Sequence, residues 1–579
     1  MNPFNRANIN FTGQKRSALD MARGRLVFLS LFFILCYIVV AARVFDLTII
    51  QGEMKKNEET VSYLEAEPRT QKKHQRADIL DRNGVILARS LKTASLYADP
   101  VMISDPKGVA KDLSRIFPDL SYGDLLKKLQ EKKRFVWIKR NITPDDQYKI
   151  LYLGQPGLSF EEENRRLYPQ GNLVSHIVGY TSVDGKGLSG MEAGFDKLLA
   201  KSEEPLVSTI DIRVQHALRR EIAGAMKKFN GIAGTGAVMD INTGEMLAAV
   251  SLPDFDPHEV NGKNKDALFN RLTLGVFEPG STFKLFTTAA AIEHGAKMGS
   301  TYDARAPIKI GRFSISDYHA ERRILTLPEV FMHSSNIGSI KMAQAVGTDD
   351  YRNFLSDLGL MKAPQIEIPE VGAPLIPHPW KEVNTMTASF GHGIAVSPLQ
   401  LVTASASIMN GGILVRPTLV LNKGAEKSGP KSDVRVVSEK TAHRMRQLMR
   451  LVVTDGTARK ANVPGYNVGG KTGTADKTSG KGYDRDKRRA SFMAFFPAEA
   501  PRYAVYIMID EPKGIKESHG YATAGWVAVP AVKNVIESII AIEGLRPQEN
   551  DELGGTLTAY VKTREQIAKE RQIAAFSDH

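Results

Sequence analysis

The sequence predicts an α/β (α+β) fold in which an antiparallel sheet is flanked by helices and joined to a second, helical lobe. Strand-like runs lie near both ends of the region 206–545, and helical runs lie between them. Three observations support this prediction: a hairpin at 235–250, a set of three strands at 467–509 and a long apolar helix at 526–542. We expect the strands from the two ends to form one sheet, because each must bury a face against the rest of its domain.

Each element has a local signal. The hairpin turns at Asn242-Thr-Gly244, where glycine tolerates a positive φ, and an amphipathic helix at 212–228 precedes it. The charged segment 477–489 is expected to be a loop between two of the later strands. Pro530 lies near the first turns of the closing helix, where proline is tolerated. The stretch 300–409 is mostly helical, so we expect it to form the second lobe, with the active site between the lobes.

Length and composition limit the class of protein. A chain of 579 residues suggests two or three domains, and 42% hydrophobic with 24% charged residues is typical of a globular protein. The formal charge is +13, but no basic run is interleaved with aromatic residues, so we expect no nucleic acid partner. A solvated basic surface explains the charge, and an anionic polymer or lipid phosphate remains as the alternative.

The N-terminal region predicts a membrane anchor. The stretch 26–42 carries no charge and its apolar character resumes after Arg43, which gives about the 20 residues that span a bilayer. Basic residues dominate before it, so the positive-inside rule keeps residues 1–25 in the cytoplasm and places the rest outside. A cleaved signal peptide is the alternative. The single cysteine, Cys36, lies in this apolar run and has no partner for an intrachain disulfide, and we expect no metal and no cofactor.

Three short motifs indicate the chemistry. They are Ser281-Thr-Phe-Lys284, Ser334-Ser-Asn336 and Lys471-Thr-Gly-Thr474, in that order along the chain. Ser-x-x-Lys also occurs in two proline-bearing turns, but only the copy at Ser281 opens a helical run. Serine, lysine and asparagine side chains in this arrangement are typical of a nucleophilic serine that is activated without histidine.

The spacing within the first motif suggests how the serine is activated. Lys284 follows Ser281 by three residues, so on a helix the two side chains share one face. The helix is apolar nearly all round, which predicts a buried lysine whose pKa burial and a neighbouring cation such as Lys471 would lower. Taken singly, Ser334 could be an N-cap, Asn336 a turn residue and Lys471 a lysine on an ordinary edge strand.

These motifs and their flanks resemble a class B penicillin-binding protein. The resemblance rests on the three motifs with their flanks at 277–284 and 334–338, and on the membrane anchor. It also rests on three patterns nearer the N-terminus, which are Asp81-Arg-Asn-Gly84, Arg166 with Tyr168-Pro169, and Gly190-Met-Glu192. Ala77 stands where the family usually has glycine, which affects the local turn. The asparagine in the second motif and its flank are closer to the cell-division branch of the family than to the elongation branch.

The resemblance implies a peptidoglycan D,D-transpeptidase that binds β-lactams. Ser281 would attack the D-Ala–D-Ala carbonyl, Lys284 would be the general base and Ser334 would pass a proton to the leaving group. Asn336 would bind the substrate amide, and the backbone N–H groups of Ser281 and Thr474 would form the oxyanion hole. The segment Lys471, Thr472, Gly473 and Thr474 would receive the terminal carboxylate.

The resemblance also implies partners and a division of the chain. The expected partners are stem peptides, lipid-linked precursor glycan, a membrane glycan polymerase and other division proteins. The expected parts are a cytoplasmic segment (1–25), a transmembrane helix (26–47), an elongated α+β pedestal (48–205), a transpeptidase domain (206–545) and a C-terminal tail or exposed helix (546–579). His176 in the pedestal is interpreted as a hydrogen-bonded structural histidine. An elongation-specific transpeptidase, a D,D-carboxypeptidase or β-lactamase, and an inactive scaffold remain as alternatives.

Overall fold

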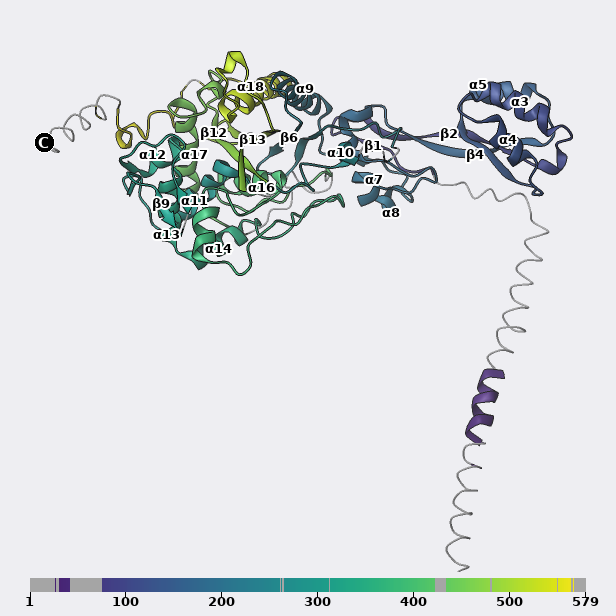
Figure 1. Ribbon diagram of the computed structural model, residues 1–579, viewed down its shortest axis with the longest axis horizontal. Helices are drawn as coiled ribbons and strands as arrows, with labels where there is room; N and C mark the ends of the chain where they lie inside the picture. The colour runs from purple at the N-terminus through teal and green to yellow at the C-terminus, as the bar shows by residue number, and fades with distance from the viewer. Residues whose placement is uncertain are drawn as a thin grey trace, which may run out of the picture. The chain divides into compact units, whose positions relative to one another are not determined.

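The computed structural model describes most of the chain, namely residues 27, 31–41, 75–260, 262, 265–311, 313–421, 434–479, 482–548, 550–563 and 566. It divides into two units, 1–74 and 75–579 (Figure 1). In the first unit an apolar helix covers Leu31–Ala41, and its large apolar side chains are exposed. The predicted transmembrane helix at 26–47 otherwise lies outside the described residues.

The second unit begins with a mixed sheet in the order β3-β2-β1-β5, with β4 also paired to β2. The strands are β1 (Ile79–Leu80), β2 (Ile86–Ala98), β3 (Val136–Ile142), β4 (Leu158–Leu167) and β5 (Leu206–Val207). The long β2–β4 pair reaches to three helices, α3 (Pro106–Ile116), α4 (Tyr122–Leu129) and α5 (Pro144–Tyr152), which share a small core with it (Figure 1). Each helix starts at an N-cap side chain that accepts a backbone N–H, from Asp105, Ser121 and Thr143.

The three family-like patterns of the pedestal meet in this sheet. In the Asp81-Arg-Asn-Gly84 turn, the Asp81 carboxylate accepts the N–H groups of Asn83 and Val85, and Gly84 has a φ of 90°. Glu192 is fully buried in α7 (Gly190–Gly194), where its two oxygens accept from Arg76 Nε at 2.5 Å and Arg166 Nε at 2.7 Å. Glu192 therefore links three chain segments that are distant in sequence, because a buried charge that loses its partner of opposite sign is strongly destabilising.

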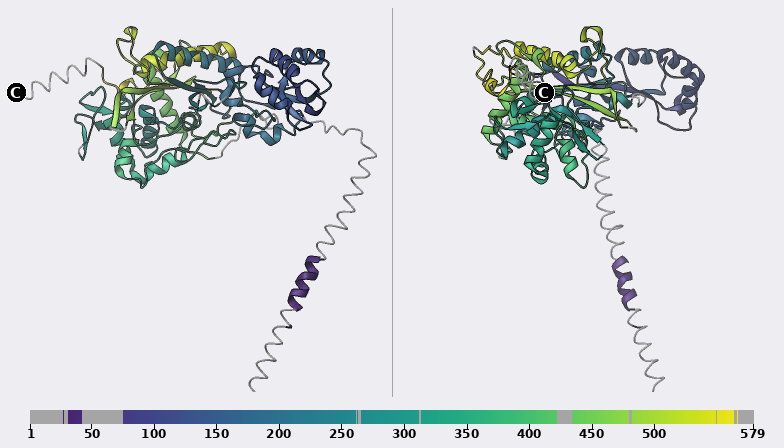
Figure 2. Two further views of the ribbon diagram at one scale, coloured as in Figure 1. Left: turned by 45° about the vertical axis from the view of Figure 1, so that its right-hand side comes forward. Right: turned by 60° about the vertical axis from the view of Figure 1, so that its left-hand side comes forward.

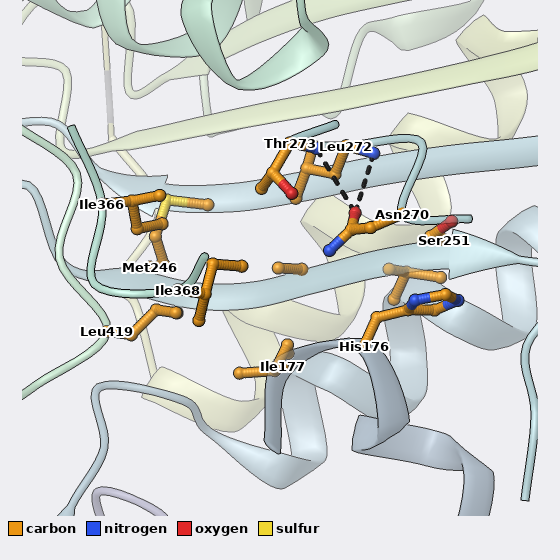
Figure 3. A pocket seen from close by; sticks show the side chains of 12 residues that line it. His176, Ile177, Met246, Ser251, Asn270, Leu272, Thr273, Ile366, Ile368 and Leu419 are labelled. Atoms are coloured by element: carbon orange, nitrogen blue, oxygen red, sulfur yellow. Dashed lines mark hydrogen bonds between the residues drawn. The ribbon is translucent and has the colours of Figure 1, made fainter. Parts of the chain in front are cut away.

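A small cavity lies between the pedestal and strand β7 (Met246–Leu252) of the second sheet (Figure 3). His176 and Ile177 from the pedestal line it, together with Asn270 and residues of β7. Burial lowers the pKa of His176 to about 4, so its ring is neutral at pH 7. Its Nε2 has no hydrogen-bond partner among the described residues, but backbone groups of Pro253 and Ala267 form hydrogen bonds with the ring, which agrees with the structural histidine expected from the sequence.

The catalytic sheet is antiparallel throughout, in the order β12-β13-β14-β6-β7. Its strands are β6 (Ala233–Asp240), β7 (Met246–Leu252), β12 (Gly469–Ser479), β13 (Gly482–Phe496) and β14 (Tyr503–Asp510). The expected sheet built from both ends of the domain is confirmed, because β14 pairs with β6. The charged loop expected at 477–489 is wrong: β12 and β13 continue as a pair through Lys477 opposite Asp484. Lys477 also forms ion pairs with Asp510 and Glu511. These pairs neutralise the charge of Lys477 within the sheet.

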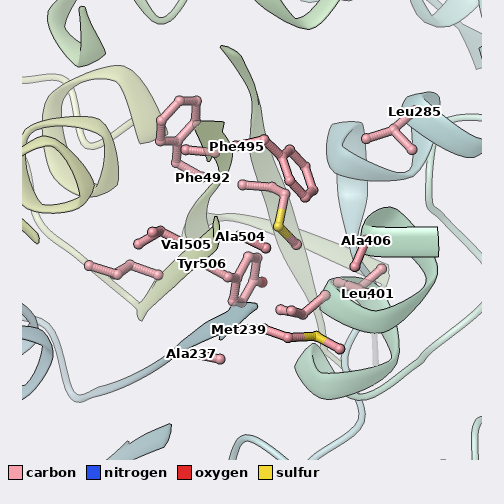
Figure 4. Packing of buried hydrophobic residues seen from close by; sticks show 14 of the residues in the cluster. Ala237, Met239, Leu285, Leu401, Ala406, Phe492, Phe495, Ala504, Val505 and Tyr506 are labelled. Atoms are coloured by element: carbon pink, nitrogen blue, oxygen red, sulfur yellow. The ribbon is translucent and has the colours of Figure 1, made fainter. Parts of the chain in front are cut away.

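Helices cover both faces of this sheet. On one face α9 (Ile212–Lys228) and α18 (Ala524–Glu543) lie side by side (Figure 1 and Figure 2). Within the described residues α18 is the one helix long and apolar enough to span a membrane, but one side of it is buried in the core. On the other face Leu401 of α16 (Pro398–Met409) lies against Met239 and Tyr506 of the sheet (Figure 4).

The helical lobe contains most of the remaining helices. They are α11 (Lys284–Glu293), α12 (Leu327–Met332), α13 (Asn336–Val346), α14 (Thr348–Asp357), α15 (Glu382–Ala388) and α17 (Glu439–Thr454). Two small sheets, β8 (Thr301–Asp303) with β11 (Ile324–Thr326) and β9 (Ile308–Ile310) with β10 (Phe313–Ile315), lie among them. The lobe expected at 300–409 is therefore largely helical, as predicted.

The C-terminal segment differs from the exposed tail or helix expected from its polar composition. Residues 550–563, which we call the C-terminal strap, lie against the helical lobe. Asp551 pairs with the buried Arg450 of α17 at 2.6 Å, and Leu553 and Leu557 are buried. The Lys562 N–H donates to Glu329 of α12 at 3.0 Å. The strap is ordered because it supplies partners for a buried arginine and a buried glutamate.

Candidate active site

The turn before α11 presents Ser281. It belongs to a short 3-10 turn (Gly280–Phe283) that leads directly into α11, so the expected helix begins with a tighter first turn. Gly280 has a φ of 56°, and its N–H donates to the Gly391 carbonyl at 3.1 Å. A Cβ at Gly280 would lie 2.9 Å from that of Ala475, so the turn packs directly on β12. This contact fixes the height of Ser281 above the sheet.

Lys284 is buried beneath Ser281 and is 1% exposed. Its Nζ lies 3.1 Å from Ser281 Oγ, 3.1 Å from Ser334 Oγ and 2.7 Å from Asn336 Oδ1, and it also contacts the Ser334 carbonyl. An ammonium group has only three protons, so it cannot donate to four acceptors at once. A neutral amine would donate to two and offer its lone pair to a hydroxyl, which is the arrangement a base needs.

Burial and charge favour the neutral amine. Burial holds the pKa of Lys284 well below its ordinary value, and the nearby Lys471 lowers it further, while Asp317 acts in the opposite direction. Lys471 is 0% exposed, and burial lowers its pKa to about 7. The site therefore holds two buried lysines whose pKa values are both lowered.

The hydroxyl of Ser334 joins the two lysines. Lys471 Nζ lies 3.0 Å from Ser334 Oγ, and Lys284 approaches the same atom from the other side. Ser334 has a φ of 59°, a left-handed conformation that costs a non-glycine residue roughly 1–3 kcal/mol. The N-cap of α13 is Ser335, whose hydroxyl accepts the Gly338 N–H at 3.0 Å. The alternative that Ser334 is only a cap is therefore wrong.

The three motifs, which follow one another along the chain, thus meet in space. Residues 234–537 match the family model "Penicillin binding protein transpeptidase domain", and residues 71–203 match "Penicillin-binding Protein dimerisation domain". This chain belongs to the penicillin-binding protein transpeptidase family. The first match alone covers more than half of the chain.

Relatives and solved structures agree with this assignment. The chain is 39% identical to the probable peptidoglycan D,D-transpeptidase FtsI of Caulobacter vibrioides, over 81% of this chain and 82% of that protein. It is 30% identical to the peptidoglycan D,D-transpeptidase FtsI of Escherichia coli, over 82% of this chain and 84% of that protein. The crystal structure of penicillin binding protein 3 from Mycobacterium tuberculosis, complexed with ampicillin, is similar with a TM-score of 0.65 and 25% identity. That likeness covers 83% of this chain and 97% of the other.

In this penicillin-binding protein, β12 contributes the last part of the site. Side chains alternate along a strand, so Thr472 and Thr474 share one face. Thr472 Oγ1 lies 2.8 Å from Thr457 Oγ1, and Thr474 Oγ1 accepts the Ala524 N–H at 3.3 Å. A Cβ at Gly473 would lie 2.6 Å from Ser491 Oγ and 2.7 Å from Thr282 Cγ2, so only glycine fits between β13 and the serine turn.

Asp317 is a site residue that the sequence analysis missed. One carboxylate oxygen accepts the N–H groups of Asn336 and Ile337, and the other accepts the Ser335 hydroxyl at 2.7 Å. Asp317 therefore holds the start of α13, where Ser334 and Asn336 sit. It lies in an irregular segment with no motif around it, so no sequence signal pointed to it. Asn336 is further held through Nδ2, which donates to the Ser316 carbonyl at 3.0 Å.

Proposed function

We propose that this penicillin-binding protein is a peptidoglycan D,D-transpeptidase that cross-links stem peptides through an acyl-serine intermediate and that β-lactams acylate the same serine. One observation carries the proposal: Ser281 Oγ lies 3.1 Å from the amine of a fully buried lysine whose pKa is held low. A serine hydroxyl is a poor nucleophile until a base takes its proton, and a neutral Lys284 at hydrogen-bond distance is such a base.

The reaction follows from this geometry. Ser281 Oγ attacks the carbonyl carbon between the last two D-alanines, and Lys284 takes the hydroxyl proton. The oxyanion is stabilised by the backbone N–H groups of Ser281 and Thr474. The C–N bond then breaks, and the leaving amine of the last D-alanine receives a proton through Ser334, whose hydroxyl touches both lysines.

The second half of the reaction reverses these proton transfers. A primary amine of a neighbouring stem peptide attacks the acyl carbon and loses a proton to the base. A new C–N bond forms, the C–O bond to Ser281 breaks, and the serine oxygen recovers its proton. Asn336 orients the substrate amide, and Lys471 with Thr472, Gly473 and Thr474 receives the terminal carboxylate of the donor. Water in place of the amine would give the carboxypeptidase reaction.

Acylation by labelled penicillin tests this proposal. The full chain in detergent should give a stable adduct that mass spectrometry maps to Ser281, and Ser281→Ala should give none. General-base assistance typically contributes about 10²–10⁴-fold, so Lys284→Ala should slow acylation by that factor. An adduct on another residue would contradict the role of Ser281, and near-normal acylation of Lys284→Ala would contradict the role of the lysine as base. Rapid release of the adduct would favour a β-lactamase.

The cellular setting is part of the proposal. The apolar helix at Leu31–Ala41 supports a single-pass anchor with a cytoplasmic N-terminus, and the catalytic domain would then lie outside the cytoplasmic membrane. The similarity to two relatives named FtsI supports the division branch, with a membrane glycan polymerase as partner. Selective inhibition should then block septum closure while growth in length continues. Rounded cells with septa still forming would assign the protein to the elongation branch.

A further inference from the structure

The serine turn, which presents the nucleophile, rests on residues 391–396, which we call the support segment. Phe277 and Val396 exchange two backbone hydrogen bonds, of 2.9 and 3.0 Å. The Gly280 N–H donates to the Gly391 carbonyl at 3.1 Å. A Cβ at Gly391 would lie 2.1 Å from the Gly280 carbonyl oxygen, so the two backbones are in direct contact. A shift of the support segment is therefore passed on to the serine turn.

Glu278 supplies a side-chain link between the serine turn and the support segment. Its Oε1 accepts the Gly393 N–H at 2.7 Å, although the two residues are 115 positions apart in the sequence. Gly393 has a φ of 71°, so the support segment bends here in a conformation that favours glycine. Hydrogen bonds to an ionised carboxylate are roughly twice as strong as those between neutral groups. Glu278 therefore holds the support segment at its bend.

The same carboxylate oxygen also holds the β12–β13 hairpin. The Tyr483 hydroxyl, near the start of β13, donates to Glu278 Oε1 at 3.1 Å. Burial and the charge of Glu278 raise the pKa of Tyr483, so its hydroxyl stays protonated and can donate. Arg489, further along β13, has its guanidinium 4.7 Å from the centre of the Phe277 ring and lines the same small cavity as Glu278. Strand β13 therefore contacts the entry to the serine turn at two points.

The reach of the Glu278 side chain explains its role better than its charge does. The charges that shift the pKa of Lys284 are those of Lys471 and Asp317, and Glu278 is not among them. A carboxylate oxygen has two lone pairs, so Oε1 can accept from the support segment and from the hairpin together. Position matters in this place, because a nucleophile displaced by about 1 Å can react about 10²-fold more slowly.

We propose that Glu278 is a positioning residue for Ser281 and acts through its hydrogen bonds to Gly393 and Tyr483. These bonds fasten the support segment and the β12–β13 hairpin to the entry of the serine turn. The inference rests on the proposed function, in which Ser281 is the nucleophile, and deepens it by naming a residue that sets where the serine oxygen lies. The quantity that Glu278 maintains is the 3.1 Å between Ser281 Oγ and Lys284 Nζ.

Two variants of Glu278 separate reach from charge. Stopped-flow acylation of the full chain by labelled benzylpenicillin gives the dissociation constant of the first complex and the rate constant of acylation. Glu278→Gln removes the charge but keeps an oxygen that can accept the Gly393 N–H, so the rate constant should stay within about threefold of wild type. Glu278→Asp keeps the charge, but its shorter side chain does not reach Gly393, so the rate constant should fall about tenfold or more. The dissociation constant should be unchanged in both variants.

Further measurements distinguish positioning from a role in stability alone. A stability role would lower Tm or the number of serines that penicillin titrates per chain, and would leave the rate constant of the titrated serines unchanged. The ascending limb of the pH profile should not move in Glu278→Asp, because the charges that shift the pKa of Lys284 are intact. Tyr483→Phe removes one of the two donors and should lower the rate constant about threefold. Glu259→Asp, at an exposed position in the same domain, is the matched control and should change nothing.

The inference fails if Glu278→Asp acylates as fast as wild type, or if Glu278→Gln loses as much rate as Glu278→Asp. It also fails if the loss appears in the dissociation constant or in the number of titrated serines while the rate constant is unchanged. If Glu278→Asp does not fold, Tyr483→Phe decides, because it leaves the bond to Gly393 in place, and a wild-type rate constant there would overturn the inference. The proposed function fails differently, by the wild-type chain forming no adduct at Ser281.

Discussion

Lys284 and Lys471 both reach the hydroxyl of Ser334, with Nζ–Oγ distances of 3.1 and 3.0 Å. Two buried amines that share one hydroxyl cannot both stay charged without a large electrostatic cost. Burial and the second cation together lower the pKa of Lys284, which favours the neutral amine that a base needs. In the proposed mechanism, the Ser334 hydroxyl carries the proton taken from Ser281 toward the leaving group.

The pH dependence of acylation should have two limbs. A protonated Lys284 cannot take a proton, so kcat/KM should rise with pH through the lowered pKa of Lys284. A ligand carboxylate needs protonated Lys471, so kcat/KM should fall as pH rises through about 7. Stopped-flow acylation by a carboxylate ligand and by its methyl ester measures both limbs. Lys471→Met should remove the descending limb for the acid, and an ester with the same descending limb would contradict this assignment.

Replacing Asp317 should affect the reaction indirectly, because its carboxylate positions the start of α13 through hydrogen bonds. Asp317→Asn keeps the size but loses the charge, so its amide cannot accept all three donors. We expect acylation to slow by about tenfold, because one lost charge-assisted interaction is worth that much. The Asp317 charge also raises the pKa of Lys284, so the ascending limb should move to lower pH. Asp303→Asn, an exposed carboxylate in the same lobe, should leave the limb in place.

The pedestal should depend strongly on Glu192. Glu192→Gln leaves Arg166 buried without a countercharge and Arg76 with only the partly exposed Asp196, which should destabilise the protein by about 3–5 kcal/mol. Thermal unfolding of the full chain measures the loss. Glu162→Gln breaks an exposed pair with Lys92 and should cost less than about 1 kcal/mol. Equal shifts in Tm for the two variants would show that the buried cluster does not stabilise the pedestal.

The C-terminal strap should stabilise the lobe that carries Ser334. Asp551→Asn removes the countercharge of Arg450, which is 5% exposed, and should cost about 1.5–3 kcal/mol. Limited proteolysis should then cut within 550–563 faster than in the wild type. Glu552→Gln alters an exposed neighbour and is the matched control. Unchanged proteolysis of Asp551→Asn would mean that burial of Leu553 and Leu557 alone holds the strap.

Short-range patterns explain which parts of this structure the sequence could predict. The Ser281 motif lies in one turn and the start of the helix that follows it, and the Lys471 motif lies in one strand, so spacing and apolar flanks were enough to find them. Asp317 and Glu278 act on groups far along the chain, Asn336 and Tyr483, from segments with no periodicity. The continuous β12–β13 pair was missed for a related reason, because the charges that suggested a loop are neutralised by residues of another strand.

The pairing of β6 with β14 also determines when this domain can fold. Val238 lies opposite Val505, so the middle of the sheet joins two strands that are far apart in the sequence. Such long-range pairing is slow, and the β6–β7 hairpin has an open edge until β14 arrives. A chain interrupted before Tyr503 would expose that edge and would leave β13 without its partner β14, so it would be prone to aggregate. The chain therefore has to be available through β14 before the sheet that carries Lys471 is complete.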